Sequence, residues 1–127
     1  MPFVRISVLE DTPPSQRREI ADAVHAALVE VAGVPPAERF QLVSAHAPTD
    51  LFFDARFPGV ERRRPVFVQI TLVRELGSEA KRLLFRVIAG RLNAAGVRGD
   101  DVFTVITENE LTDWSAANGL PHLLDSV

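Results

Sequence analysis

An internal duplication constrains the fold of this chain more than any other feature of its sequence. Three pairs of segments match in the same order, at spacings of 64, 63 and 63 residues: Phe3–Leu9 with Phe67–Val73, Ala32–Val34 with Ala95–Val97, and Phe40–Ser44 with Phe103–Thr107. One residue is lost between the first and second pairs, and the two halves otherwise run in register. The chain is therefore expected to contain one structural unit twice.

Each half carries the pattern of a strand, a helix and a return strand. Helices are expected over residues 15–32 and 78–95, because apolar side chains recur there on one helical face. Thr12 or Ser15 is the expected N-cap of the first helix, and Gly33 supplies its C-terminal stop. The strands are expected at residues 3–9, 40–45, 66–73 and 102–107.

Two such β-α-β units predict an α+β fold in a single domain, residues 1–127, with one four-stranded mixed sheet. Both helices should lie on a single face of that sheet. The opposite face would then mix apolar and polar side chains, as the alternation of Phe3, Arg5 and Leu9 indicates. Contact with identical subunits would bury this face, so a homo-oligomer is expected. The alternative is a monomer in which one face of the sheet is exposed to water.

The composition narrows the classes of partner and compartment. A net charge of −3 offers no electrostatic case for nucleic acid or an anionic membrane, and no apolar run is long enough to span a bilayer. The absence of cysteine excludes disulfides, thiolate metal sites and cysteine nucleophiles. His25, His46 and His122 are not spaced as metal ligands, so no metal is expected. The expected compartment is the cytoplasm.

The amino terminus carries the first candidate for chemistry, because a strand begins at Pro2. A small second residue allows removal of Met1, which would leave Pro2 with a free secondary amine. An α-amino group has a pKa of about 7.7–8.0, which desolvation or a nearby cation lowers, so the amine could exchange protons near neutral pH. The plain alternative is that proline is tolerated as the first residue of a strand. If Met1 stays, the nitrogen is an amide.

Two segments lie outside the duplicated units. Residues 47–64 contain Phe52, Phe53 and Phe57, and are too apolar for a disordered linker, so an ordered hairpin or loop is expected. The tail from residue 109 holds the only tryptophan, Trp114. Such a tail is expected to fold over a sheet edge or a neighbouring subunit.

With both the duplication and Pro2 in place, the chain resembles the tautomerase superfamily, and within it the malonate semialdehyde decarboxylase-like group. The resemblance spans most of the chain and rests on the following segments: Met1-Pro2 with its strand, Gly33-Val34-Pro35, Arg39–Val43, Gly59–Arg62, the strand ending at Arg74, and Asp113-Trp114-Ser115.

This resemblance implies a small, typically trimeric enzyme without cofactor that uses its amino-terminal proline in catalysis. Pro2 would be the acid/base, and Arg74 matches the first of two arginines at the end of the third strand. Leu76 stands where the second arginine is expected, and Glu38 where the decarboxylase has aspartate. Arg62 and Trp114 fall on matching positions and are candidates for substrate binding.

Arg74 would suit a small oxo-acid substrate, because its guanidinium can bind the substrate carboxylate in a bidentate manner. The reaction is either keto–enol tautomerisation or a malonate semialdehyde decarboxylation; a non-catalytic trimeric binding protein is the alternative. Glu38 either pairs with Arg39 on the surface or orients the Pro2 amine or a water molecule. Arg62 could equally be a solvated charge before an apolar strand, and Trp114 a packing anchor.

Overall fold

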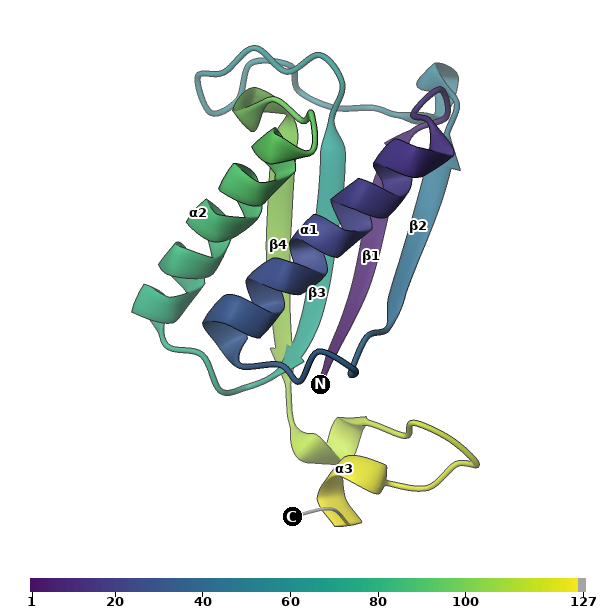
Figure 1. Ribbon diagram of the computed structural model, residues 1–127, viewed down its shortest axis with the longest axis vertical. Helices are drawn as coiled ribbons and strands as arrows, with labels where there is room; N and C mark the ends of the chain where they lie inside the picture. The colour runs from purple at the N-terminus through teal and green to yellow at the C-terminus, as the bar shows by residue number, and fades with distance from the viewer. Residues whose placement is uncertain (126–127) are drawn as a thin grey trace.

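The computed structural model describes residues 1–125 and contains the duplicated unit (Figure 1). The first unit comprises β1 (Pro2–Leu9), α1 (Pro14–Ala32) and β2 (Gln41–His46). The second unit comprises β3 (Val66–Val73), α2 (Ser78–Ala94) and β4 (Val102–Asn109). Short helices occupy the connections and the tail: η1 (Pro48–Asp50), η2 (Gly99–Asp101), η3 (Leu111–Asp113) and α3 (His122–Asp125).

The strands form one four-stranded sheet in the order β2-β1-β3-β4. Within each unit the two strands are parallel, whereas β1 and β3 are antiparallel at the centre. The registers are equivalent, because Val4 pairs with Gln41 in the first unit and Val68 with Thr104 in the second. Both α1 and α2 cross the same face of the sheet (Figure 1). The predicted fold class is therefore confirmed.

The core lies between this face and the two helices. Alternate residues of the central strands point toward the helices and are buried, as the period of two in a strand requires. Each helix contributes one apolar stripe, and the principal buried side chains are Val4, Ile6, Val8, Val68, Ile70, Leu72, Ile20, Val24, Leu28, Leu84, Ile88 and Leu92. Burying one such side chain contributes about 1.5–3 kcal/mol.

The predicted C-terminal end of α1 is confirmed, whereas its predicted N-cap is wrong. Gly33 ends the helix in the left-handed conformation, with φ of 67°, as predicted. The predicted N-cap is wrong: Pro13 occupies that position, and no side chain caps the helix. Pro14 at the first helical position lacks an N–H, which removes one of the donors that a capping side chain would satisfy.

Two segments lie outside the duplicated units, the connection of residues 47–64 and the tail after β4. Residues 47–64 form a loop rather than a hairpin, and Phe52 is 90% exposed within it. The tail extends beyond the sheet end at which β3 and β4 finish, rather than over a sheet edge of this chain (Figure 1). Within residues 1–125, none of the helices combines the length and the apolar character needed to span a bilayer.

The sheet face opposite the helices carries exposed apolar side chains. Leu42 and Val105 are 51% and 41% exposed, and both lie on this face because their register partners Arg5 and Gln69 do. Phe103 is also exposed there and packs against Phe67, with ring centroids 5.5 Å apart. In this single chain the face thus keeps Leu42, Phe103 and Val105 between 41% and 51% exposed.

Candidate active site

The antiparallel pairing of the central strands brings the beginning of β1 to the end of β3. Pro2 pairs with Leu72, and Leu72 pairs with Glu108 of β4, so these three residues form one row across the sheet. Arg74 follows two residues after Leu72, and its backbone N–H donates to the carbonyl of Asn109 at 2.8 Å. One chain therefore places Pro2 and Arg74 at the same end of the sheet.

Pro2 adjoins two residues that line a small cavity, Met1 before it and its strand partner Leu72. Its side chain is fully buried, and Met1 before it is half-buried. Met1 lines the cavity together with residues from the end of α1 and the end of β3, namely Ala32, Gly33, Val34, Pro35, Leu72, Val73, Glu75 and Leu76. While Met1 is attached, the Pro2 nitrogen is an amide without a basic lone pair. Removal of Met1 would free the nitrogen and enlarge this cavity.

Arg74 has a carboxylate neighbour on the next strand. Its Nε lies 3.2 Å from Oε1 of Glu110, and the two side chains are 64% and 65% exposed. Glu110 was not a candidate from the sequence. Its closeness to Arg74 follows from the parallel pairing of β3 and β4, which matches Val73 with Asn109.

Glu108 and Lys81 form a second ion pair at this end of the sheet. The Glu108 side chain is only 11% exposed; one oxygen accepts a hydrogen bond from Nζ of Lys81, and the other is buried without a hydrogen-bond partner. The hydrogen bond from Lys81 lowers the pKa of Glu108, and the charges of Lys81 and Arg74 act in the same direction. Glu108 is thus a carboxylate at neutral pH. Sequence reasoning missed this pair.

Glu38 lies in the turn that leads into β2. It is half-buried, and its backbone N–H donates to the Pro35 carbonyl at 2.9 Å. Arg39 forms its ion pair with Asp22, with 2.7 Å between Nη2 and Oδ1, and donates through Nε to Gln41. The surface pair between Glu38 and Arg39 considered from the sequence is therefore not formed.

In the second unit, the residue equivalent to Glu38 forms hydrogen bonds with the segment that precedes the strand. Asp101 is the duplicate of Glu38, 63 residues later, and ends an equivalent turn in which its N–H donates to the Arg98 carbonyl. Its Oδ1 accepts hydrogen bonds from the backbone N–H groups of Arg63 and Arg64, at 2.7 and 3.1 Å. Those residues lead into β3 as Met1 leads into β1. From this equivalence we infer that Glu38 lies near the start of the chain.

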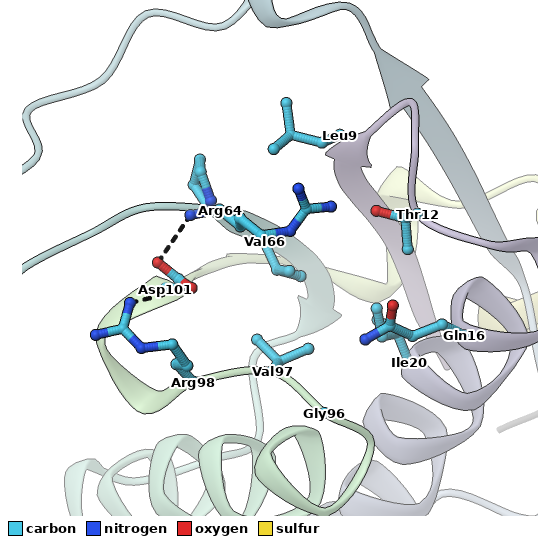
Figure 2. A pocket seen from close by; sticks show the side chains of 11 residues that line it. Leu9, Thr12, Gln16, Ile20, Arg64, Val66, Gly96, Val97, Arg98 and Asp101 are labelled. Carbon is cyan, nitrogen blue, oxygen red and sulfur yellow. Dashed lines mark hydrogen bonds and ion pairs between the residues drawn. The ribbon is translucent and has the colours of Figure 1, made fainter.

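Figure 2 shows the corresponding cavity of the second unit, at the opposite end of the sheet. Its lining includes the duplicates of Met1, Gly33, Val34 and Glu38, which are Pro65, Gly96, Val97 and Asp101. Its two arginines are already partnered: Arg64 by Asp11 at 2.6 Å, and Arg98 by Asp101 at 3.6 Å. The nitrogen of Pro65 is held in a peptide bond, so this cavity has no free amine.

Arg62 lies four residues before β3, at the end of the sheet away from Pro2, so a single chain does not bring it to the candidate site. It is buried, and its Nη1 donates to the carbonyls of Asp54 and Phe57 at 2.7 and 2.9 Å. Its guanidinium also lies 5.9 Å from the centre of the Phe103 ring. These contacts hold the loop of residues 47–64, so Arg62 is not a solvated charge, and its role in substrate binding stays a prediction.

Trp114 lies at the same end of the sheet as Pro2. Its indole N–H donates to Oδ1 of Asn109 at 2.7 Å, and the backbone carbonyl of Asn109 accepts from Arg74. Trp114 therefore ties the tail to the end of β4 through Asn109, the same residue whose carbonyl accepts from Arg74. Among residues 1–125, no group of three or more His, Cys, Asp or Glu side chains could hold a metal ion.

Comparisons with known proteins agree with this geometry. Two family models, each described as "Tautomerase enzyme", match residues 38–117 and 2–56. The probable tautomerase YusQ of Bacillus subtilis (strain 168) is 29% identical over 127 residues, covering 98% of this chain and all of that protein.

Solved structures give the same picture. FG41 malonate semialdehyde decarboxylase, inhibited by 3-bromopropiolate, superposes with a TM-score of 0.92 at 38% identity, covering 98% of this chain and 95% of that one. A fused 4-OT described as a symmetric trimer shares the fold, with a TM-score of 0.77 at 24% identity over 93% of this chain and 94% of that one.

Proposed function

The chain belongs to the tautomerase superfamily and is similar to its malonate semialdehyde decarboxylase-like members, and we propose that it is a cofactor-free enzyme acting on small oxo acids. One observation carries this proposal. The antiparallel register of β1 and β3 sets Pro2 opposite Leu72, so that a candidate acid/base and the cation Arg74 share one end of the sheet.

The proposed chemistry depends on the charge of the freed Pro2 nitrogen. In tautomerisation, the neutral amine takes a proton from the carbon next to the substrate carbonyl, and a proton is returned to the oxygen as the enol forms. In decarboxylation of a β-oxo acid, the cationic amine instead donates a hydrogen bond to the carbonyl oxygen. It thereby stabilises the enolate charge that develops as the carbon–carbon bond to the carboxylate breaks and carbon dioxide leaves.

The other residues have supporting roles in this proposal. Arg74 binds the substrate carboxylate, and Glu38, beside the chain start, orients the Pro2 amine or a water molecule. Trp114 walls the site from the tail side while anchoring the tail to Asn109. With Leu76 in place of a second arginine, the substrate carboxylate has one cation fewer, so we expect tautomerisation to exceed decarboxylation.

We also propose that the enzyme is a homotrimer. The exposed apolar side chains on the open sheet face, among them Leu42, Phe103 and Val105, support assembly, because contact with other subunits would remove them from water. The fused 4-OT that shares this fold is described as a symmetric trimer. The cytoplasmic location inferred from the sequence stays a prediction.

One observation favours a second candidate, a non-catalytic binding protein of the same fold. Met1 itself lines the cavity beside Pro2, and a retained Met1 would hold the Pro2 nitrogen in an amide, so that proline could not act as the base. The two candidates differ in a quantity that is simple to measure, the intact mass of the purified protein with or without Met1.

The decisive experiment compares two preparations of the same chain. One is the processed protein; the other retains Met1 because methionine aminopeptidase was inhibited during production. Each is assayed with the enol of phenylpyruvate and with malonate semialdehyde. We expect ketonisation only from the processed protein. Equal activity of both preparations would refute the proline mechanism, and a naturally retained Met1 without turnover would favour the binding protein.

A further inference from the structure

Arg74, the proposed ligand of the substrate carboxylate, already contacts a carboxylate from its own chain. Oε1 of Glu110 lies 3.2 Å from Nε of Arg74. A carboxylate that binds the side of a guanidinium in a bidentate manner needs both Nε and one terminal nitrogen. Glu110 therefore occupies one of the two donors that such a substrate would use.

The backbone holds Glu110 in this position. Arg74 and Glu110 follow directly after the paired residues Val73 and Asn109, and the Arg74 N–H donates to the Asn109 carbonyl at 2.8 Å. The turn after Glu110 is closed from both sides: the Glu110 N–H donates to Oδ2 of Asp113 at 2.8 Å, and the Asp113 N–H donates to the Glu110 carbonyl at 3.0 Å. The backbone at Glu110 is thus held beside Arg74 by hydrogen bonds within the chain.

We propose that Glu110 is a specificity-determining residue, an internal carboxylate that competes with the substrate carboxylate for Arg74. The inference rests on the function proposed above. Both side chains are about two-thirds exposed, so the contact is weak enough for a substrate to displace. Displacement nevertheless has a cost, which falls on every ligand that binds Arg74 through a carboxylate and not on a ligand that lacks one.

Competition of this kind has a recognisable signature. It raises KM without changing kcat, because Glu110 leaves Arg74 before the reacting atoms are in place. It acts only on ligands that carry a carboxylate. It also weakens as salt screens the exposed ion pair.

The test is Glu110→Gln, which removes the charge and keeps a side-chain oxygen that can accept from the Asp113 N–H as Glu110 does. We expect KM for the carboxylate substrate to fall about 1.5- to 5-fold at low salt, with kcat unchanged and the difference shrinking in high salt. Malonate binding, measured by calorimetry, should tighten by the same factor. A methyl ester of the substrate should show no change.

Two further variants make the outcome unambiguous. Glu79→Gln removes the same charge from an exposed pair with Arg82 in α2, at 3.1 Å, and should change neither KM nor malonate binding. Combined with Arg74→Ala, Glu110→Gln should have no further effect. If Arg74→Ala raises KM but Glu110→Gln leaves KM and malonate affinity unchanged, this inference is wrong. If Arg74→Ala itself leaves KM unchanged, the proposed carboxylate ligand is wrong and the inference fails with it.

Discussion

Two basic residues at the Pro2 end of the sheet each form an ion pair with a glutamate, and the two pairs differ in their exposure to water. Lys81 and Glu108 are largely withdrawn from water, at 31% and 11% exposure, whereas Arg74 and Glu110 remain mostly exposed. The withdrawn pair should therefore affect stability, and the exposed pair should affect ligand binding. The following two predictions separate these roles.

Arg74→Ala should raise KM for a carboxylate substrate about 10- to 100-fold, since a hydrogen bond to a charged group contributes about 1.5–3 kcal/mol. Arg74→Lys should restore part of this loss as a point charge. Steady-state kinetics would measure both. Arg63→Ala, at the other end of the sheet, removes an exposed arginine of similar accessibility and should leave KM unchanged. An equal effect of the two alanine variants would contradict the assignment.

Lys81→Met should lower the melting temperature at pH 7, because it leaves the Glu108 carboxylate without its hydrogen-bond donor. Folding lowers the pKa of Glu108, so the pair stabilises the protein above the unfolded pKa of about 4.3 and loses this effect as the pH falls through the folded value. The difference between Lys81→Met and the wild type should therefore shrink in acid. Thermal unfolding from pH 7 to pH 3 would measure this.

The matched control for that experiment is Arg82→Met. Arg82 lies on the same helix, in an exposed pair with Glu79, and its loss should change stability by less than about 0.5 kcal/mol at either pH. Equal destabilisation by the two variants would show that the burial of Glu108 is not what matters.

At the scale of elements, two glycines predict opposite effects of the same substitution. Gly33→Ala should destabilise the protein by about 1–2 kcal/mol, because a residue with a Cβ is strained at the φ of 67° found there. A clash would not explain this loss, since a Cβ at Gly33 would meet no atom within 4 Å. Gly90→Ala, within α2 and equally open, should stabilise by about 0.5–1 kcal/mol through helix propensity. Chemical denaturation measures both, and effects of the same sign would contradict this account.

The elements were largely predictable because their signals are local or repeated. The expected strand at residues 66–73 agrees with β3, since alternation and the duplication both mark it. β4 continues two residues beyond the expected end at 107, because its pairing with β3 persists to Asn109, and pairing between strands is not a local property.

The site was less predictable for the same reason. Pro2 and Arg74 could be proposed from strand ends and from resemblance, whereas Lys81 and Glu108 lie 27 residues apart and meet only when α2 packs over β4. An ordered loop was expected over residues 47–64, but no sequence pattern indicated that the Arg62 side chain binds its carbonyls. Long-range packing, rather than local propensity, accounts for these differences.

At the scale of the whole molecule, the open sheet face predicts how assembly can be disrupted. Val105→Lys should dissociate the proposed trimer while leaving the fold intact, because Val105 lies on that face at 41% exposure and outside the core. Light scattering and circular dichroism would measure mass and fold. Leu83→Lys, at a similarly exposed position on the helical side, should leave the mass unchanged. A wild type that is monomeric at micromolar concentration would refute the assembly itself.

The twin cavities have a consequence for the number of reactive groups that the molecule can carry. A β-α-β unit supplies a free α-amine only where a polypeptide begins, and the peptide bond from Arg64 to Pro65 leaves the second unit without one. A chain that joins two β-α-β units therefore has one amino terminus for every two units. The second cavity is lined instead by two arginines that form ion pairs within the chain, Arg64 with Asp11 and Arg98 with Asp101.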